Sequence, residues 1–478
     1  MSAQTAEPTV RSGCVGVVPL TARLEPWQLE LLGDPARLAG IVSEHGSPVN
    51  LLDPGPMERN AAELIDSARR SGTDLQIYFA RKANKALALV DEARRLGLGI
   101  DLASQVELEQ VLERGVPGAN LMMTAAVKPA ALLTRCLESG TTIAVDNEDE
   151  LERIGELSQS MSIRAEIALR MAPDLGPARP QTRFGLEPTA WLDALARQPN
   201  PKPMLRVSGV HFHLDGYSVD DRVKAIEQAL GLVFALRGEG HPIEFVDIGG
   251  GIPMSYLDDG TEWERFWAEH SQALAGRRDE VTFDNHELAT VYPYHQAPVR
   301  GQWLAELLGS RIASGSTVAE ELRSHKLRLR CEPGRSLLDG CGLTVARVEF
   351  RKQRHDGTWL IGLAMNRTQC RSTSDDFMAD PLLVSAGDRP SDRDIEGYLV
   401  GAYCIERELL TLRRMRFPGG VAVGDLIVFP NTAGYLMHIL ESTSHQIPLA
   451  RNLVLADPGV AKLDDIDQPG LALRSAMN

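Results

Sequence analysis

Short apolar runs alternate with amphipathic stretches along the first two-thirds of the chain. Runs such as 75–80 and 142–146 are largely apolar, which is typical of strands buried on both faces. The stretches between such runs, for example 57–72 and 104–115, are rich in Ala, Leu, Glu and Arg and have helical character. Ser104 is placed to cap the second of these helices, with Glu107 three residues on completing a capping box.

This alternation predicts βαβ units and a parallel sheet. The expected strands are 75–80, 99–103, 120–125, 142–146 and 164–172, and the helices between them are 57–72, 85–97, 104–115, 128–140 and 147–158. At least five units follow in series, and no Gly-x-Gly-x-x-Gly follows the first strand. We therefore expect an α/β barrel of the TIM type rather than an open dinucleotide-binding sheet.

The pattern of apolar and polar residues changes after about residue 340. Stretches such as "LTVARVEFRKQ" and "DLIVFP" alternate like strands, with Gly, Pro and Asp turns between them and few helices. We expect a mostly β domain over 339–478, a sandwich or barrel. The barrel domain is expected over 46–338, with an insertion at about 258–325, and residues 1–45 as an extension packing on the β domain.

The composition of the chain argues against several classes of binding partner and site. The formal net charge is −15, which disfavours nucleic acid and anionic membranes as partners. The six cysteines form no Cys-x-x-Cys pair, so we expect no zinc site and no disulfide framework. Neither a signal peptide nor an apolar run of membrane-spanning length is evident, and we expect a cytoplasmic protein.

One expected strand ends in a cluster of basic residues, "IYFARKANK" at 77–85. Chemistry in such barrels sits at the C-terminal strand ends, where Lys82, Asp101 and Asp146 fall. An arbitrary loop lysine is usually a solvated one. The functional alternative is a Schiff-base lysine, which needs a desolvated amine of depressed pKa facing a carbonyl cofactor or substrate.

Two further motifs follow strands. "GVHFHLDGY" (209–217) holds two histidines at alternate positions, which suits either a metal or an imidazole stacked on a flat cofactor. No third metal ligand is evident nearby. "FVDIGGGIP" (245–253) ends in consecutive glycines whose amides can approach a phosphate, although a flexible turn would look the same.

"CEPGRSLLDG" (331–340) combines an acid, a Pro-Gly turn and an arginine. Glu332 facing a pyridine nitrogen would keep it protonated and make the ring a better electron sink, and Arg335 could clamp phosphate oxygens. "GAYCIERELL" (401–410) and "GDLIVFPNTAGY" (424–435) place polar residues on short turns of the β domain, where each alone is most often structural.

The order of these motifs resembles that of the fold type III pyridoxal-phosphate decarboxylases, the diaminopimelate, ornithine and arginine decarboxylase group. The resemblance runs from about residue 45 to about 450, and "EPGR" is its most specific piece. It implies cofactor contacts by Lys82, Asp101, Arg170, His213, Gly249, Gly250, Gly251, Glu332, Gly334, Arg335 and Tyr435. It implies catalysis by Lys82, Cys404, His213 and Glu332, and substrate contacts by Arg335, Glu406, Glu408 and Tyr435.

The resemblance implies pyridoxal 5′-phosphate as cofactor, bound through Lys82, and decarboxylation of an amino acid as the reaction. Glu332 would hold the ring nitrogen protonated, and Cys404 or Lys82 would return a proton to Cα. It also implies a homodimer in which Cys404 enters the partner's site. The substrate would be a diamino or carboxylated amino acid of a specialised biosynthetic pathway.

The chain departs from the family pattern in three places. Asp215 and Gly216 stand where a Gly-Ser pair is usual, so a hydroxyl contact to phosphate is lost unless Tyr217 or Ser218 replaces it. Ile405 replaces the acid that usually follows the cysteine. The segment 283–303 lies in the expected insertion and is either a surface decoration, a substrate lid or a dimer contact.

Two other functions remain open at this point. A racemase or epimerase of the same cofactor class would carry an arginine at the ring nitrogen, and Glu332 argues against it. A non-catalytic pyridoxal-phosphate-binding protein would resemble a bare barrel, and the expected β domain argues against that.

Overall fold

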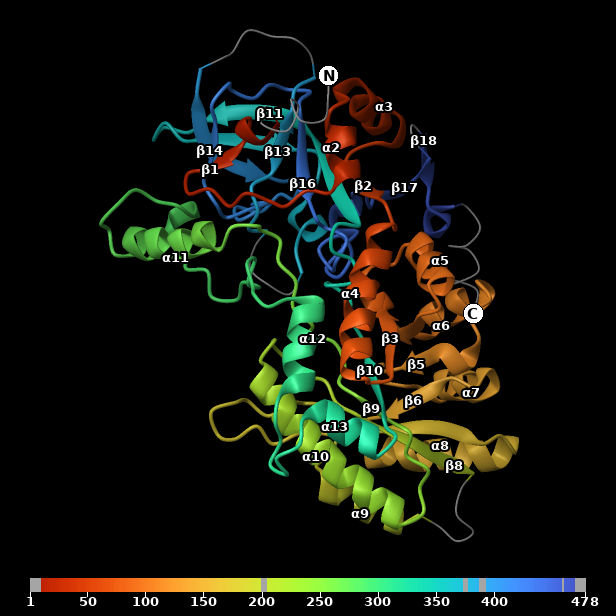
Figure 1. Ribbon diagram of the computed structural model, residues 1–478. Helices are drawn as coiled ribbons and strands as arrows, with labels where there is room; N and C mark the ends of the chain where they lie inside the picture. Colours follow the sequence, from red (N-terminus) through yellow and green to blue (C-terminus); the bar gives the residue numbers. More distant parts are fainter. Residues whose placement is uncertain (1–9, 199–203, 373–376, 387–392, 458–459, 469–478) are drawn as a thin grey trace.

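The computed structural model describes residues 10–198, 204–372, 377–386, 393–457 and 460–468. It contains a closed parallel barrel and a separate, mostly β domain. In Figure 1 the barrel is in the lower part of the picture and the β domain in the upper part. This arrangement confirms the predicted fold class. Residues 1–9 and 469–478 of the predicted outer domains lie outside the described residues.

The barrel closes in the order β10-β3-β4-β5-β6-β7-β8-β9, with parallel pairing between neighbours. Its strands are β3 (Leu75–Ala80), β4 (Gly99–Leu102), β5 (Leu121–Met123), β6 (Thr142–Val145), β7 (Ala165–Arg170), β8 (Leu205–His211), β9 (Phe245–Asp247) and β10 (Arg328–Cys331). Strands β4, β5 and β6 are buried at every position, which is why they read as continuous apolar runs.

A ring of helices surrounds the barrel. It consists of α4 (Pro56–Ser71), α5 (Leu87–Arg95), α6 (Gln105–Glu113), α7 (Ala130–Ser139), α8 (Glu148–Met161), α9 (Pro188–Ala196), α10 (Val219–Gly238), α12 (Arg300–Gly309) and α13 (Val318–Ser324). Alternate strand residues, such as Ile77 and Phe79, pack outward against these helices. The inward set, including Tyr78 and Phe245, forms its own cluster inside the barrel.

The start of α6 differs in one bond from the predicted capping box. The Ser104 hydroxyl accepts from the backbone N–H of Glu107 at 3.2 Å, as expected. The Glu107 carboxylate, however, accepts from the backbone N–H of Ala103 at 2.7 Å rather than from that of Ser104. The cap therefore also fixes the residue that follows β4, next to the strand end where Asp101 lies.

The second domain is a 10-stranded sheet whose main path runs β1-β15-β14-β12-β11-β2-β17-β18, with β13 and β16 attached beside β11. The strands are β1 (Val15–Gly16), β2 (Val49–Leu52), β11 (Gly342–Gln353), β12 (Trp359–Leu363), β13 (Leu382–Val384), β14 (Ile395–Val400), β15 (Met415–Phe417), β16 (Leu426–Pro430), β17 (Arg451–Asp457) and β18 (Val460–Leu463). Helices α2 (Pro26–Leu32) and α3 (Pro35–His45) pack on this sheet through a shared apolar cluster.

Strand β2 lies in this sheet, although the predicted barrel domain begins at residue 46. It pairs antiparallel with β11 and parallel with β17, and all its residues are buried. The chain therefore contributes two strands, β1 and β2, to the β domain before it enters the barrel, whose first strand is β3.

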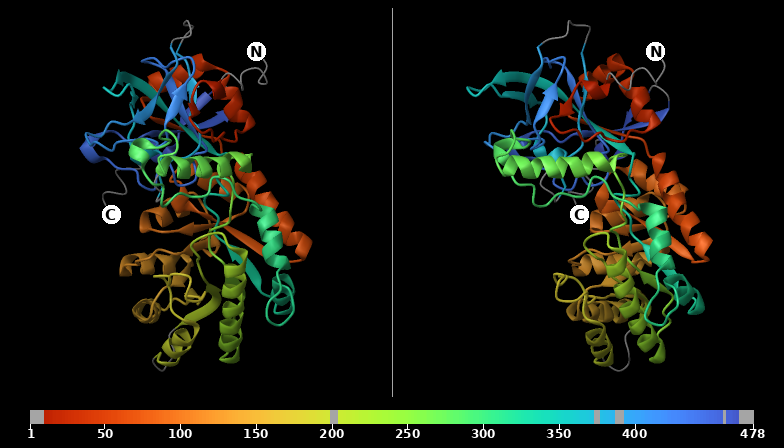
Figure 2. Two further views of the ribbon diagram at one scale, coloured as in Figure 1. Left: turned by 90° about the vertical axis from the view of Figure 1, so that its left-hand side faces the viewer. Right: turned by 60° about the vertical axis from the view of Figure 1, so that its left-hand side comes forward.

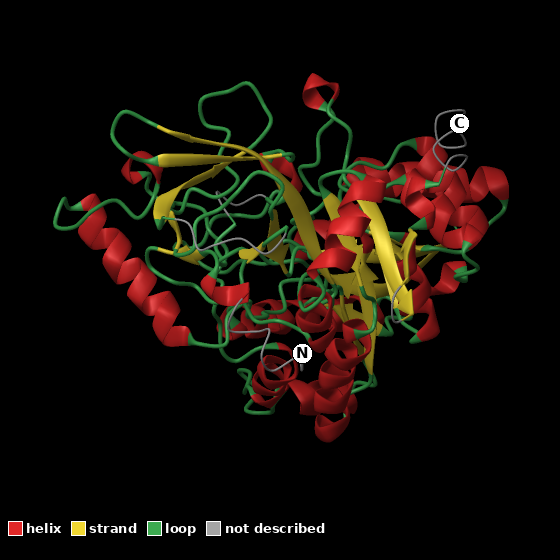
Figure 3. Ribbon diagram, turned by 90° about the horizontal axis from the view of Figure 1, so that it is seen from above, coloured by secondary structure: helices red, strands yellow, loops and turns green. Residues whose placement is uncertain are grey.

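The predicted insertion divides into two parts. Helix α12 packs on α4 within the helical ring, where Arg300 pairs with Glu63 at 2.8 Å. The earlier part, with α11 (Gly260–Leu274) and the segment up to Tyr294, packs instead on the core of the β domain. Helix α11 lies apart from the other helices, at the left edge in Figures 1 and 3 and beneath the sheet in Figure 2.

Among the described residues, no helix combines the length and the apolar character that a membrane crossing requires.

Candidate active site

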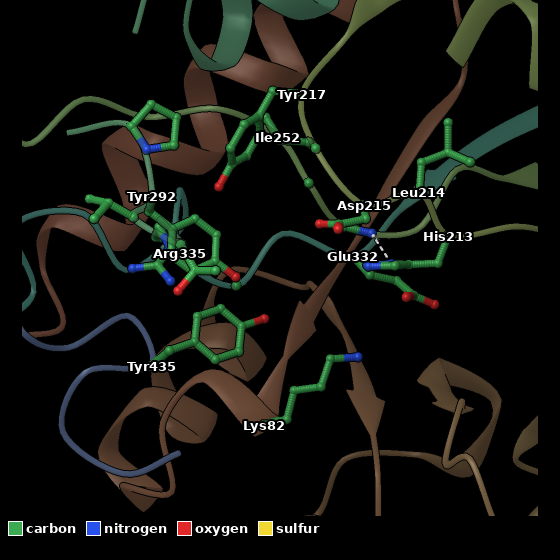
Figure 4. A pocket seen from close by; sticks show the side chains of 17 residues that line it. Lys82, His213, Leu214, Asp215, Tyr217, Ile252, Tyr292, Glu332, Arg335 and Tyr435 are labelled. Atoms are coloured by element: carbon green, nitrogen blue, oxygen red, sulfur yellow. Dashed lines mark hydrogen bonds between the residues drawn. The ribbon is translucent and has the colours of Figure 1, made fainter. Parts of the chain in front are cut away.

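A cavity of about 520 Å³ opens at the C-terminal ends of the barrel strands. It is lined by Lys82, residues 213–217, residues 250–252, residues 290–293, Glu332, Gly334, Arg335 and Tyr435. These residues come from barrel loops, from the insertion and from the β domain. In Figure 4 Lys82 reaches in from below, with Tyr435 and Arg335 on one side and His213 and Glu332 on the other.

Lys82 occupies a 3₁₀ turn, η1 (Arg81–Ala83), directly after β3. Its Nζ donates to the Asp101 carboxylate at 2.7 Å, and Asp101 in turn accepts from the Thr124 hydroxyl. Burial lowers the pKa of Lys82, but the carboxylates of Asp101 and Glu332 outweigh burial and raise that pKa overall. The amine is therefore a cation held in one position by a buried acid, and the expectation of a depressed pKa at Lys82 is wrong because Asp101 and Glu332 lie so close to it.

Glu332 follows β10, and its side chain is buried with one face on the cavity. His211 Nε2 lies 3.2 Å from Glu332 Oε1. Burial raises the pKa of Glu332, and the cations Lys82, Arg170 and Arg330 oppose that shift. The carboxylate is thus placed among cations while its immediate neighbour is an imidazole.

His213 presents its ring to the cavity, and its Nδ1 accepts from the backbone N–H of Gly250 at 3.2 Å. Burial and the nearby Lys82 cation hold the pKa of His213 well below its usual value, so the ring is neutral at physiological pH. The glycines behind it are needed: Gly249 has φ +64°, and a Cβ there would lie 2.7 Å from the carbonyl oxygen of Phe212. A neutral imidazole face and an unobstructed backbone therefore adjoin each other.

Arg335 forms the opposite wall with several tyrosines. Its NH1 donates to the Tyr256 hydroxyl at 2.6 Å, and its guanidinium carbon lies 4.1 Å from the centre of the Tyr292 ring. A Cβ on Gly334 would lie 2.6 Å from the Tyr435 hydroxyl, so that hydroxyl approaches the backbone closely. Among the described residues no carboxylate pairs with Arg335, which leaves this cation available to an anion in the cavity.

Two predicted cofactor residues lie behind the cavity wall, and a third, Gly249, is likewise not part of its lining. Asp101 is fully buried beneath Lys82. Arg170 pairs with Asp146 at 3.4 Å, and its guanidinium lies 4.0 Å above the Phe184 ring. Neither Asp101 nor Arg170 lines the cavity; Asp101 contacts the lining residue Lys82.

The predicted cysteine loop lies outside this cavity. Cys404 and Glu406 are exposed to solvent. Glu408 is buried, and it accepts from the backbone N–H of Arg367 at 2.8 Å within its own chain. The structure therefore does not bring these three residues to the Lys82 cavity of the same chain.

The cavity also contains residues for which the sequence predicted no definite role. Thr290, Val291, Tyr292 and Pro293 come from the insertion and close one wall. Of the two residues considered as replacements for the missing hydroxyl, Tyr217 lines the cavity, whereas the Ser218 hydroxyl caps α10 by accepting from Asp221 N–H at 3.2 Å. Two signals in the sequence mark the insertion: the 80 residues that separate Gly251 from Glu332, and the aromatic- and His-rich composition of 283–303.

Comparisons with known proteins bear on the family of the chain. Residues 59–288 match the family model described as the pyridoxal binding domain of pyridoxal-dependent decarboxylases. The chain is 31% identical to the uncharacterized protein y4yA of Sinorhizobium fredii, over 87% of this chain and 89% of that protein. It is 25% identical to the diaminopimelate decarboxylase of Pseudomonas aeruginosa, over 85% and 87% of the two chains.

Among solved structures, the diaminopimelate decarboxylase from M. jannaschii matches with a TM-score of 0.69 and 19% identity, over 92% of this chain and 94% of that one. At this identity the match concerns the fold, which in both proteins is a barrel with a β domain.

Proposed function

Because the chain belongs to the fold type III pyridoxal-phosphate-dependent decarboxylases, we propose that it releases the α-carboxylate of an amino acid as carbon dioxide. The observation that carries this proposal is that one cavity brings together the amine of Lys82, the neutral ring of His213 and the buried carboxylate of Glu332. An amine, a flat stacking surface and an acid are the groups that a pyridoxal ring requires from its protein.

Pyridoxal phosphate is the cofactor of this family, and the residues of the cavity fit it. Gly250, Gly251 and Gly334 line the cavity and leave backbone without side chains on that wall, so a phosphate could approach it closely. Arg335 and the Tyr435 hydroxyl offer donors to an anion. When bound, the cofactor supplies an electron sink for the bond that breaks at Cα.

The chain's own residues divide the remaining work in this proposal. Lys82 holds the cofactor, and Asp101 keeps the amine in place. Glu332 holds a proton at the ring nitrogen, and the face of His213 fixes the plane of the ring. The proton returned to Cα comes from Lys82 or from the partner subunit's Cys404.

A racemase is a weaker candidate for this site. An arginine at the ring nitrogen would suit racemisation, because it leaves that nitrogen unprotonated. The residue in that position here is Glu332, whose contact is the neutral His211. Neither Glu332 nor His211 would favour an unprotonated ring nitrogen in the cofactor.

We further propose that the substrate is a diamino or carboxylated amino acid from a specialised biosynthetic pathway. The guanidinium of Arg335 faces the cavity beside neutral phenols, so this wall is suited to bind an anion, either a phosphate or an anionic group of the substrate. Ile405 is exposed and stands where the family usually has an acid. This supports a substrate whose far end differs from that of the family's usual substrates.

The assembly proposed is a homodimer with shared sites. The exposure of Cys404 and its neighbours supports it, since a loop that enters a second subunit must be accessible in the single chain. A cytoplasmic location stays a prediction from the sequence.

The test of the function is carbon dioxide release from the holoenzyme with a panel of amino acids, run beside a chiral assay of recovered substrate. Lys82→Ala is the negative control. Release of carbon dioxide with a matching amine product, identified by mass spectrometry, supports the proposal. Loss of optical activity without carbon dioxide would show a racemase, and neither change across acidic, basic and neutral amino acids would argue for a binding protein.

A further inference from the structure

Ionisable residues form a layer across four neighbouring strands of the barrel. Arg170 on β7 is in register with His211 on β8, His211 with Asp247 on β9, and Asp247 with Arg330 on β10. Matched positions on adjacent parallel strands point to the same face of a sheet. All four residues are buried. The layer therefore lies inside the barrel, and Glu332 follows two residues after Arg330, toward the cavity.

The middle of this layer touches Glu332. One ligand-type atom each from His211, Asp247 and Glu332 lies within 4.8 Å of the other two. His211 Nε2 is 3.2 Å from Glu332, and Asp247 Oδ1 accepts from the backbone N–H of Gly249 at 2.9 Å. Among the described residues, Asp247 Oδ2 has no hydrogen-bond partner. One oxygen of Asp247 is thus engaged by the Gly249 amide, and the other is left without a partner in a residue whose carboxylate neighbours that of Glu332.

Arg330 does not neutralise Asp247 by a direct ion pair among the described residues. Its guanidinium carbon instead lies 3.5 Å from the centre of the Phe245 ring, and 5.1 Å from that of Tyr78. Two ionised carboxylates this close in a buried site would repel each other strongly, so one of them keeps a proton. Burial and Glu332 hold the pKa of Asp247 well above its usual value, and burial and Arg170 hold that of His211 well below.

We propose that His211 and Asp247 are positioning residues that each offer a hydrogen to the Glu332 carboxylate and so keep Glu332 the anion that would face the ring nitrogen of the cofactor. His211 donates through Nε2–H, and Asp247 through the hydrogen on its free oxygen. The inference rests on the proposed contact between Glu332 and the ring nitrogen. It adds that the acid is itself held by two neutral donors from neighbouring strands.

Asp247→Asn and Asp247→Leu form a matched pair that tests this proposal. Asparagine keeps a carbonyl oxygen for the Gly249 N–H and places an N–H where the proposal puts the acid's O–H. Leucine keeps similar volume without either group. The measurements are the affinity of the apoprotein for pyridoxal phosphate and the pH midpoint of the absorption change of the bound cofactor. Lys82, Asp101, Arg170 and Arg330, the other charged groups near the cluster, are the same in every variant.

The asparagine variant should stay within about twofold of the wild type in cofactor affinity, with an unchanged spectral midpoint, because the donor is retained. The leucine variant should lose about tenfold or more in affinity and shift the midpoint, because a hydrogen bond to a charged group is lost. An asparagine variant as impaired as leucine would overturn the proposal, since it would mean that the negative charge of Asp247 is what the site needs.

His211→Gln and His211→Met give a second pair, which decides the case if Asp247→Leu does not fold. Glutamine can place an N–H near the position of Nε2, and methionine cannot. Spectral behaviour restored by glutamine supports positioning, and equal loss in both overturns it. These readouts need no turnover, so a chain that shows this pattern but releases no carbon dioxide would refute the proposed function and leave the inference standing.

Discussion

The Nζ of Lys82 lies 2.7 Å from a carboxylate oxygen of Asp101. Lys82 follows β3, and Asp101 lies near the end of the adjacent strand β4. This pairing distinguishes Lys82 from the other lysines nearby. Lys85 pairs with Glu441, away from the cavity, and Lys128 pairs with Glu150 at 2.9 Å. Among the described residues that line the cavity, Lys82 is the only lysine. Its partner is a buried acid that faces the same strand ends.

Borohydride reduction of the holoenzyme should therefore attach the cofactor to Lys82. Peptide mass spectrometry should find the reduced adduct on the peptide that contains Lys82 and not on one that carries Lys128. The variants Lys82→Ala and Lys128→Ala are the matched pair, and only the first should lose the adduct. An adduct on Lys85 or Lys128 in the wild type would refute the assignment.

Glu332→Gln should retain the cofactor but lose most decarboxylation, because a neutral amide no longer stabilises a protonated ring nitrogen. The loss of one charge-assisted hydrogen bond corresponds to about 1.5–3 kcal/mol, or about one to two decades in kcat. Single-turnover rates on cofactor-loaded protein measure this. Glu306→Gln, on an exposed position of α12, controls for the substitution itself. Unchanged turnover with bound cofactor would mean that the nitrogen has another partner.

The protonated state of Asp247 has a consequence for stability. Its folded pKa is raised above the unfolded value of about 3.9, so this group stabilises the fold fully below that pH and loses its contribution as pH rises toward the folded pKa. Asp247→Asn removes the titration. The free energy of unfolding of the variant should therefore rise relative to that of the wild type as the pH rises above about 4, by up to about 1.4 kcal/mol per pH unit, which denaturant titrations over a pH series measure. A relative fall over this range would mean that Asp247 is an anion paired in the fold.

The barrel could be predicted from sequence because its strands are buried on both faces and its helices follow at regular spacing. Strand β2 could not be assigned in this way. Its apolar run would suit either sheet, and only its pairing with β11 and β17, far along the chain, places it in the β domain. Local pattern identifies a strand but not its neighbours.

The same limit applies to the site. Lys82, Glu332 and the glycines that follow β9 fall in short motifs, so the sequence indicates them. His211 and Asp247 also lie in those motifs, but their relation to Glu332 depends on the register of three strands. Tyr292 lies in no motif, and it reaches the cavity because its segment packs on the β domain.

Tyr292→Ala should weaken substrate binding more than it slows the chemical step. The ring covers the Arg335 guanidinium at 4.1 Å, and loss of a desolvated cation–π contact costs about 1–2 kcal/mol. KM should rise about fivefold to thirtyfold while kcat changes less, and Tyr292→Phe should stay close to the wild type. A drop in kcat with constant KM in the alanine variant would instead place Tyr292 in the chemistry. No effect in either variant would leave the insertion wall without a role in substrate recognition.

The shared-site dimer can be tested by mixing two inactive variants. Lys82→Ala and Cys404→Ala should each be weak or inactive alone, because each removes one group from every site. When subunits exchange, a hybrid dimer has one site with both wild-type residues and one with neither. Statistical mixing makes half of the dimers hybrid and half of their sites intact, so activity should return to about a quarter of the wild-type value at most. Size-exclusion chromatography with a tagged subunit verifies the exchange. If exchange is complete and no activity returns, Lys82 and Cys404 do not meet across a two-fold interface, and the exposed position of Cys404 must have another explanation.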